Sequence, residues 1–347
     1  MTTQGLAAWA TDRGATPGAA RVLARVLVGR FAGRKHNDSA SVRLVELARR
    51  ELADDIPAVV SASAADGTAR FAVHLSDGEL VESVVIPHGT RTTVCLSTQV
   101  GCARACVFCE TGRLGLARQL ATQEITGQFA AVARWLARKG KAPPTNVVFM
   151  GMGEPLDNLD AVLAASAVLV DPSGFAIAEQ RITVSTVGVV PKLRELYARS
   201  KQRVAVSLHV ANDAERAALL PIARAWDLAA LRGAIAASPR TVLLQWTLIE
   251  GKNDSLRHAN ELLAFCEGLA VRINLIPLNP GPDDSLRAPT PEHVRAFQKR
   301  LADAGLRVMV RLPHGQEVGG ACGQLAGALR ETPERRSKLP IAGRARL

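Results

Sequence analysis

The sequence predicts an α/β protein whose main domain is an open (β/α)6 barrel, with a doubly wound parallel sheet as the main rival. Two observations predict this class. From about residue 93, short apolar runs alternate with longer segments of helical period, and strands that alternate with helices pair in parallel through right-handed crossovers. Polar side chains also stand where the apolar runs end, and a parallel barrel collects its reactive groups at these carboxyl ends.

The elements of the main domain follow in chain order. The expected strands are residues 93–96, 146–150, 181–185, 203–208, 242–248 and 271–276, with a last strand at 307–312. The expected helices are residues 122–138, 158–169, 190–200, 227–237, 255–268 and 291–304. Six strand–helix units are the reason for the barrel prediction.

Three other segments complete the predicted organisation. Residues 1–55 form a helical accessory module rich in arginine, and two interpretations stay open, a module that contacts RNA or a solvated helical face. Residues 56–92 form a short β-hairpin linker element, because a Ser-Asp-Gly turn at 76–78 separates two alternating stretches. The barrel domain with a C-terminal cysteine loop covers 93–331, and a basic tail covers 332–347.

The composition bounds the class of protein. The 347 residues correspond to one large domain or about two domains, and 48% are hydrophobic, which suffices for a full core. The 43 basic residues outnumber the 32 acidic ones, which favours a polyanion such as RNA, with compositional drift as the alternative. No secretory signal or membrane-spanning run is visible. We therefore expect a cytoplasmic protein without membrane contact.

A cysteine loop is the most specific motif. Cys102, Cys106 and Cys109 stand in a C-x3-C-x2-C spacing, with Phe108 before the last cysteine. Three thiolates can hold three irons of a [4Fe–4S] cluster and leave the fourth iron open to a small molecule. Zinc would normally need a fourth local cysteine or histidine, and unrelated buried thiols are the other alternative. Thiols clustered in this way suit metal ligation in a reducing compartment.

Strand ends supply further candidates. Gly153 and Glu154 follow an apolar run, where a glycine lets backbone approach a ligand and a carboxylate can pair with an ammonium group. Alone, such a motif would favour an ordinary loop with turn residues over a ligand site. The other polar groups at strand ends are Ser185, Ser207, His209 and Asn279.

Two cysteines outside the loop differ in their surroundings. Cys322 lies among glycines and alanine, which predicts a mobile segment with an accessible thiol. Cys266 follows leucines and a phenylalanine, which predicts a structural residue of the core.

Six motifs resemble one family. CLSTQVGCARACVFC, GMGEPLDN, ITVSTVG, AVSLHV, IPLNP and ACGQLAG occur in the order seen in the RlmN/Cfr family of radical SAM RNA methyltransferases, from about residue 81 to residue 326. Other radical SAM enzymes share only the cluster loop and the Gly-Glu-Pro region. The resemblance implies the radical SAM partial barrel, a [4Fe–4S] cluster and S-adenosylmethionine (SAM).

The resemblance also implies roles for individual residues. Cys102, Cys106 and Cys109 would ligate the cluster. Cys322 would carry the methyl group as S-methylcysteine, and Cys95 would resolve the product through a transient disulfide with Cys322. Glu82 would be the proton acceptor. The SAM site would be lined by Gly153, Glu154, Ser185, Ser207, Leu208, His209 and Asn279.

The implied reaction is methylation of an adenosine ring carbon of 23S ribosomal RNA, with C2 favoured over C8 and transfer RNA as a second target. A reducing donor such as flavodoxin or ferredoxin would supply electrons, and a monomer is favoured. The segment 314–318 departs from the family's Arg-Gly-x-Asp-Ile, and the N-terminal 80 residues match poorly. The alternatives are the same chemistry on a peptide or small molecule, and a non-catalytic cluster protein that binds RNA or acts as a sensor.

Overall fold

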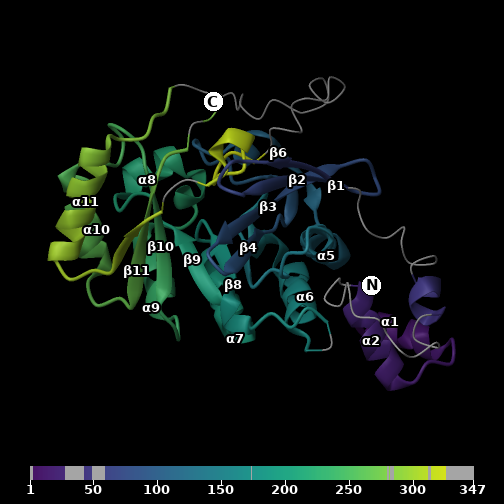
Figure 1. The fold of residues 1–347 in the computed structure, drawn as a ribbon. Helices are drawn as coiled ribbons and strands as arrows, with labels where there is room; N and C mark the ends of the chain where they lie inside the picture. Colours follow the sequence, from purple (N-terminus) through teal and green to yellow (C-terminus); the bar gives the residue numbers. More distant parts are fainter. Residues whose placement is uncertain are drawn as a thin grey trace.

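One curved ten-stranded sheet forms the centre of the molecule (Figure 1). The structure, a computed structural model, describes residues 3–27, 43–48, 59–172, 174–279, 281, 285–311 and 314–325. The strands in spatial order are β1 (Val59–Ser63), β2 (Ala69–His74), β3 (Leu80–His88), β4 (Arg91–Cys95), β7 (Asn146–Phe149), β8 (Ile182–Thr186), β9 (Arg203–Ser207), β10 (Val242–Leu248), β11 (Val271–Pro277) and β12 (Val308–Val310).

The strand order decides between the two predicted architectures. From β4 to β12 every neighbouring pair is parallel, and the spatial order follows the sequence order without a reversal. A doubly wound sheet needs a reversal, so that helices cover both faces. Here β1 and β12 are the two ends of the sheet. The open (β/α)6 barrel is therefore confirmed, and the doubly wound rival is excluded.

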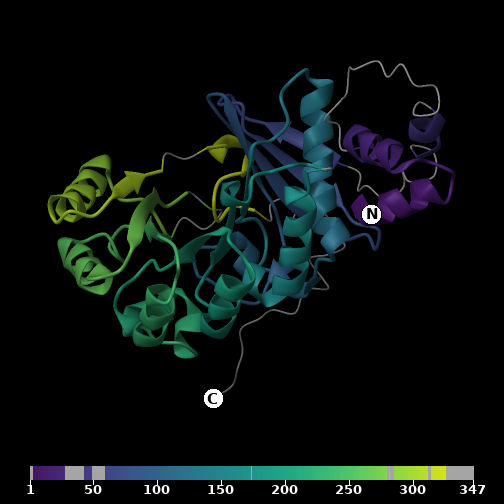
Figure 2. The ribbon, with the colours of Figure 1, turned by 90° about the horizontal axis from the view of Figure 1, so that it is seen from below.

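Helices line the outer side of the curved sheet (Figure 2). Helix α5 begins where the Glu124 carboxylate accepts a hydrogen bond from the Ala121 N–H at 2.8 Å, and its buried face repeats at helical spacing through Ile125, Phe129 and Leu136. The barrel helices are α5 (Thr122–Arg138), α6 (Leu159–Val170), α7 (Val190–Arg199), α8 (Asp213–Leu219), α9 (Leu228–Ala236), α10 (Leu256–Cys266) and α11 (Pro291–Asp303).

The predicted hairpin linker is joined to the main sheet. Strands β1, β2 and β3 are antiparallel, and β3 pairs antiparallel with β4, so that Val84 lies opposite Cys95. The predicted turn at 76–78 does connect β2 to β3. The segment thus extends the edge of the barrel sheet, which brings its side chains next to the candidate site. Where domains divide in this part of the chain stays a prediction.

The N-terminal helices form a hydrophobic cluster of their own. Helices α1 (Thr3–Thr11) and α2 (Pro17–Leu27) pack together with helical residues 43–48. The rest of the predicted module 1–55 and the predicted tail 332–347 lie outside the described residues. None of the described helices is long and apolar enough to cross a membrane.

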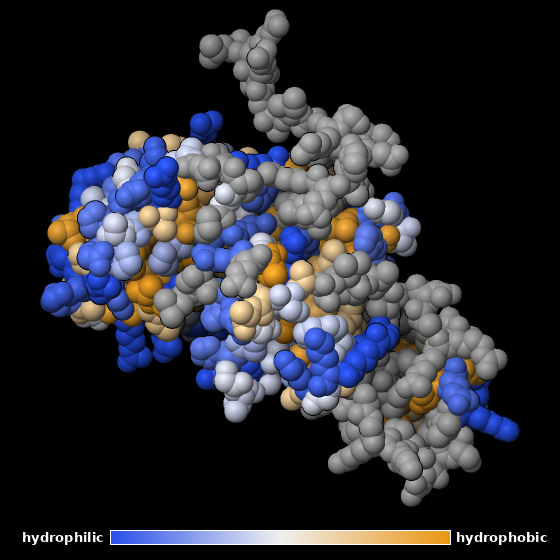
Figure 3. Space-filling view, turned by 45° about the horizontal axis from the view of Figure 1, so that its top comes forward, coloured by the Kyte–Doolittle hydropathy of each residue, from blue (hydrophilic) through white to orange (hydrophobic). Residues whose placement is uncertain are grey.

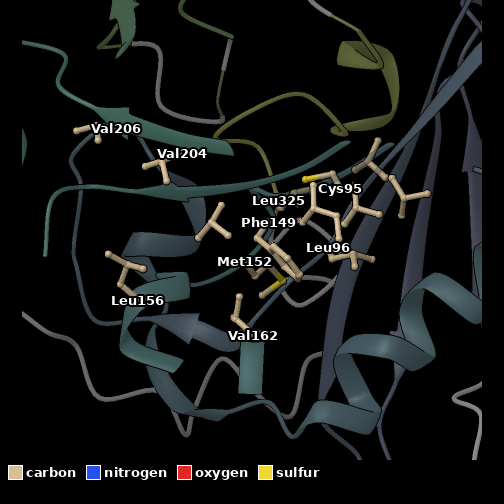
Figure 4. Close-up of a cluster of buried hydrophobic side chains, with 14 of the residues drawn as sticks. Cys95, Leu96, Phe149, Met152, Leu156, Val162, Val204, Val206 and Leu325 are labelled. Carbon is tan, nitrogen blue, oxygen red and sulfur yellow. The ribbon is translucent and has the colours of Figure 1, made fainter. Parts of the chain in front are cut away.

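Most buried aliphatic and aromatic side chains of the barrel domain form one large cluster, and a smaller one lies around Leu220 and Ile249. Cys95, Leu96 and Leu325 belong to the large cluster (Figure 4). Cys266 is buried in the same cluster at 3% exposure, as predicted for a structural cysteine. On the face that Figure 3 shows, most coloured side chains are hydrophilic, and hydrophobic ones form separate groups among them.

Candidate active site

The cysteine loop is held by a hairpin that the sequence did not predict. Strands β5 (Gln99–Cys102) and β6 (Gly115–Gln119) form a separate two-stranded antiparallel sheet, with the short helix α4 (Glu110–Arg113) between them. Arg104, inside the loop, donates from Nε to Asp157 Oδ2 at 2.7 Å, which ties the loop to the segment after β7. The two strands are short, and glycine and glutamine leave them without an apolar run, so that local propensity gave no signal.

The three loop thiols fit a polynuclear cluster better than one zinc ion. Burial raises the pKa of Cys102 to about 12, and burial together with the other two thiols raises that of Cys106. A bound metal cation reverses this effect, because it favours the thiolate. Ligands of one tetrahedral zinc lie roughly 4 Å apart. Among the described residues, the three sulfurs are not a group whose ligand atoms all lie within 4.8 Å of one another. Their donor set and their wider spacing suit an iron–sulfur cluster.

A cleft adjoins the cysteine loop at the carboxyl ends of the strands. Of the residues predicted for the SAM site, Leu208 alone does not line it, because its side chain is fully buried while its N–H donates to the Gln245 carbonyl at 3.0 Å. The predicted residues that do line the cleft are Gly153, Glu154, Ser185, Ser207, His209, Asn279, Cys106, Cys109 and Cys322.

Glu154 is a buried carboxylate in this cleft, 3% exposed. Its Oε1 accepts from the Leu156 N–H at 3.0 Å and its Oε2 from the Val187 N–H at 2.9 Å. Burial raises its pKa to about 7. Gly153 has a φ of +101°, and a Cβ there would lie 2.5 Å from the Cβ of Gln99. Backbone freedom and close approach both require glycine at this position.

A buried amide connects two of the predicted hydroxyls. Ser185 Oγ donates to Gln245 Oε1 at 3.1 Å, and Ser207 Oγ donates to the same oxygen at 3.4 Å. The register of β9 and β10 places Ser207 directly beside Gln245. We did not predict Gln245, although a lone amide in the apolar run of β10 was a visible signal.

His209 is a neutral hydrogen-bond donor. Its Nδ1 accepts from the Thr247 N–H at 2.8 Å, which leaves the ring proton on Nε2. Burial, followed by the charge of Arg216, lowers its pKa to about 3. Phe108 of the cysteine loop packs edge-to-face against the ring at 4.8 Å. This contact joins the loop to the end of β9.

Hydrogen bonds connect the loop that carries Cys322 to both sides of the cleft. Asn279 Nδ2 donates to the Cys322 carbonyl at 2.9 Å, and Asn279 Oδ1 accepts from Gln316 Nε2 at 2.9 Å. The Glu110 N–H donates to the Gly323 carbonyl at 2.8 Å. The Cys322 residue is half-buried. These bonds connect the loop to the cysteine loop and to the residue pair after β11, and the mobility of this segment stays a prediction.

A second, small cavity brings Cys95 and Cys322 together, and Asn279, Met150 and Cys322 line both cavities. Arg311, which the sequence did not single out, lines this second cavity. Burial and the charge of Cys322 raise the pKa of Cys95 to about 12, and Arg311 acts in the opposite direction. All six cysteines are free, so the expected Cys95–Cys322 disulfide is not formed in this structure.

Glu82 lies on the same face of the sheet as Cys95 but lines neither cavity. Val84 pairs with Cys95 across β3 and β4, and Glu82 lies two residues from Val84 on the same face. Its buried carboxylate accepts from Arg70 Nη1 at 2.8 Å. Arg70 comes from β2, and the sequence gave no indication of this pair. The role of Glu82 as a proton acceptor stays a prediction.

Known proteins resemble this chain over most of its length. Residues 96–263 match the radical SAM superfamily. A protein of Sorangium cellulosum with the name "Probable RNA methyltransferase sce1580" is 46% identical, over 91% of this chain and 79% of its own. The dual-specificity RNA methyltransferase RlmN of Syntrophobacter fumaroxidans is 39% identical, over 91% of this chain and 94% of its own.

The fold agrees with these matches. The crystal structure of a radical SAM methyltransferase from Sphaerobacter thermophilus superimposes with a TM-score of 0.84 at 34% identity, over 94% of this chain and 98% of that one. The sequence identity extends over nearly the whole length, and the cysteine loop opens onto a cleft at the strand ends. The chain therefore belongs to the RlmN/Cfr family of radical SAM RNA methyltransferases.

Proposed function

We propose that the protein methylates an adenosine ring carbon of 23S ribosomal RNA through a methylcysteine at Cys322, with C2 favoured over C8 and transfer RNA as a second target. The observation that carries this proposal is the position of Cys322, which lines both the cleft beside the cysteine loop and the cavity of Cys95. A thiol at this junction has one cavity in which to receive a methyl group and another in which to pass it on.

The family uses a [4Fe–4S] cluster and SAM, and the residues present suit both. In our proposal Cys102, Cys106 and Cys109 hold the cluster. When bound, the cluster and SAM supply the methyl group and the one-electron chemistry that an electron-poor ring carbon requires. The Glu154 carboxylate would pair with the ammonium group of SAM, and the His209 Nε2–H would donate to a polar atom of the same ligand.

The two cysteines of the second cavity have different roles in the proposed reaction. Ionised Cys322 accepts the methyl group. After the methyl carbon has bonded to the RNA, ionised Cys95 attacks the Cys322 sulfur, so that an S–S bond forms and the bond from the Cys322 sulfur to carbon breaks. The carbon keeps the electron pair of that bond and takes up a proton. Glu82 would take the ring proton, and for this Arg70 must release its carboxylate. A cellular dithiol then reduces the disulfide.

The partners follow from the same proposal. The formal net charge of +11 suits RNA, since phosphate contacts with basic side chains drive nucleic-acid binding. A reducing donor such as flavodoxin or ferredoxin would supply electrons, and we propose a cytoplasmic monomer. The same chemistry on a peptide or small molecule is the second candidate.

Mass spectrometry of the Cys322 peptide tests the first stage. Cluster-loaded protein is incubated anaerobically with methyl-deuterated SAM and then digested. We expect a labelled methyl group on Cys322 in the wild type and in C266A, whose substituted thiol is structural, and none in C322A. An unlabelled Cys322 in protein that still cleaves SAM contradicts the proposal. Nucleoside analysis of ribosomal and transfer RNA from a deletion strain identifies the acceptor.

A further inference from the structure

We infer that Arg311 is a positioning residue that favours the ionised forms of Cys322 and Cys95. The inference rests on the proposed function, because it concerns the sulfur chemistry of the same cavity. Strand β12 ends at Val310, and the Arg311 N–H donates to the Leu275 carbonyl at 2.8 Å, so this residue continues the pairing of β12 with β11. Its side chain lines the cavity that Cys95 and Cys322 share.

Arg311 has no carboxylate partner within the described parts of the chain, where no aspartate or glutamate oxygen lies within ion-pair distance of it. Two other charged or titratable groups that the structure describes near this cavity are already paired. Glu82 binds Arg70, and His314, which lines the cavity, binds Asp66 at 3.2 Å. A half-buried guanidinium without an anion is costly. The cavity therefore suits an anion, and the two thiols are the groups that can provide one.

Arg311 and the thiols of this cavity influence one another's pKa. The two thiols raise the pKa of the Arg311 guanidinium, with Cys322 as the larger cause and burial opposing it. In turn Arg311 lowers the pKa of Cys95, against the burial that places it at about 12. An arginine keeps its charge at any pH at which the enzyme works. It is thus a permanent counter-charge for whichever thiol ionises.

Both sulfur steps depend on an ionised thiol, because the thiolate is the nucleophile. In the first step Cys322 loses its proton to solvent, its sulfur bonds to the methyl carbon, and the bond from that carbon to the sulfonium sulfur breaks. In the second step Cys95 loses its proton to solvent and attacks the Cys322 sulfur, and the bond from that sulfur to the product carbon breaks. The electron pair of that bond stays on the carbon, which takes up a proton to become the methyl group, while the two sulfurs are oxidised to the disulfide. Arg311 stabilises the charged reactant of each step without taking part in bond making.

The test measures the pH dependence of Cys322 alkylation by iodoacetamide in cluster-loaded protein, by peptide mass spectrometry. We compare the wild type with R311Q, with the charge-conserving R311K, and with R272Q, which removes an exposed arginine from the neighbouring strand β11. We expect the pH at which Cys322 alkylation reaches half its maximal rate, the midpoint, to rise by about one unit in R311Q, which slows alkylation about tenfold near neutral pH. R311K should keep at least half of the wild-type effect, and R272Q should match the wild type.

A midpoint for Cys322 that R311Q leaves unchanged overturns the inference. So does an R311K midpoint equal to that of R311Q, because a purely structural role for Arg311 would produce that result. Iron content and SAM cleavage, measured on the same samples, identify a variant that has lost its fold, and R311K then decides the question. Failure of the proposed function gives a different result, in which the wild-type Cys322 takes no methyl from SAM while its alkylation midpoint still depends on Arg311.

Discussion

Replacing Glu154 by glutamine removes the charge of the buried carboxylate in the cleft and nearly preserves its size. The wild-type carboxyl has a pKa raised to about 7 by burial, so it is largely ionised above that pH and protonated below it. Only the ionised form can pair with the ammonium group of SAM. We therefore expect SAM affinity to fall about tenfold per pH unit below about pH 7 in the wild type, and to stay nearly constant in E154Q.

The magnitude follows from the kind of bond that is lost. A hydrogen bond to a charged group contributes about 1.5–3 kcal/mol, which corresponds to a ~10- to 150-fold weaker dissociation constant for E154Q above the wild-type pKa. Glutamine also loses one acceptor, so that either the Leu156 or the Val187 N–H is left without its present partner. This second effect does not depend on pH, and the pH profile separates the two contributions.

Isothermal titration of SAM into anaerobic, cluster-loaded protein measures both quantities. E250Q is the matched control, because Glu250 is an exposed carboxylate outside the cleft. It should bind SAM with the wild-type affinity and the wild-type pH profile. The reasoning is refuted if E154Q binds SAM within about twofold of the wild type across the pH range, or keeps the wild-type pH slope.

Three further substitutions test other parts of the site. Gly153→Ala forces a side chain into a φ of +101° and against Gln99, so we expect a loss of about 1–2 kcal/mol in unfolding free energy by thermal denaturation, and weaker SAM binding. Cys102→Ala should lose most bound iron by colorimetric assay, whereas Cys266→Ala should retain it. Asp66→Ala removes the acceptor that holds the start of the C-terminal cysteine loop, and should slow RNA methylation about tenfold while SAM cleavage persists.

Local patterns determined much of the fold. Helix α5 covers Thr122–Arg138, the bounds that the sequence predicted, because helical period and the capping carboxylate of Glu124 act within a few residues. The strand–helix alternation likewise predicted the parallel barrel. The cysteine spacing predicted a metal-binding loop, since ligand spacing is a property of one short segment. None of these conclusions needed a contact between distant parts of the chain.

The tertiary structure decided what each functional side chain faces. Cys95 and Cys322 share a cavity although 226 residues separate them. Arg311 follows β12, at the opposite end of the row of parallel strands from β4, and lines the same cavity. The pairing of Glu82 with Arg70 depends on the register of β2 and β3, and a shift of one residue would turn either side chain to the opposite face. Spacing along a sequence carries no information about such long-range register, which is set by the packing of the whole sheet.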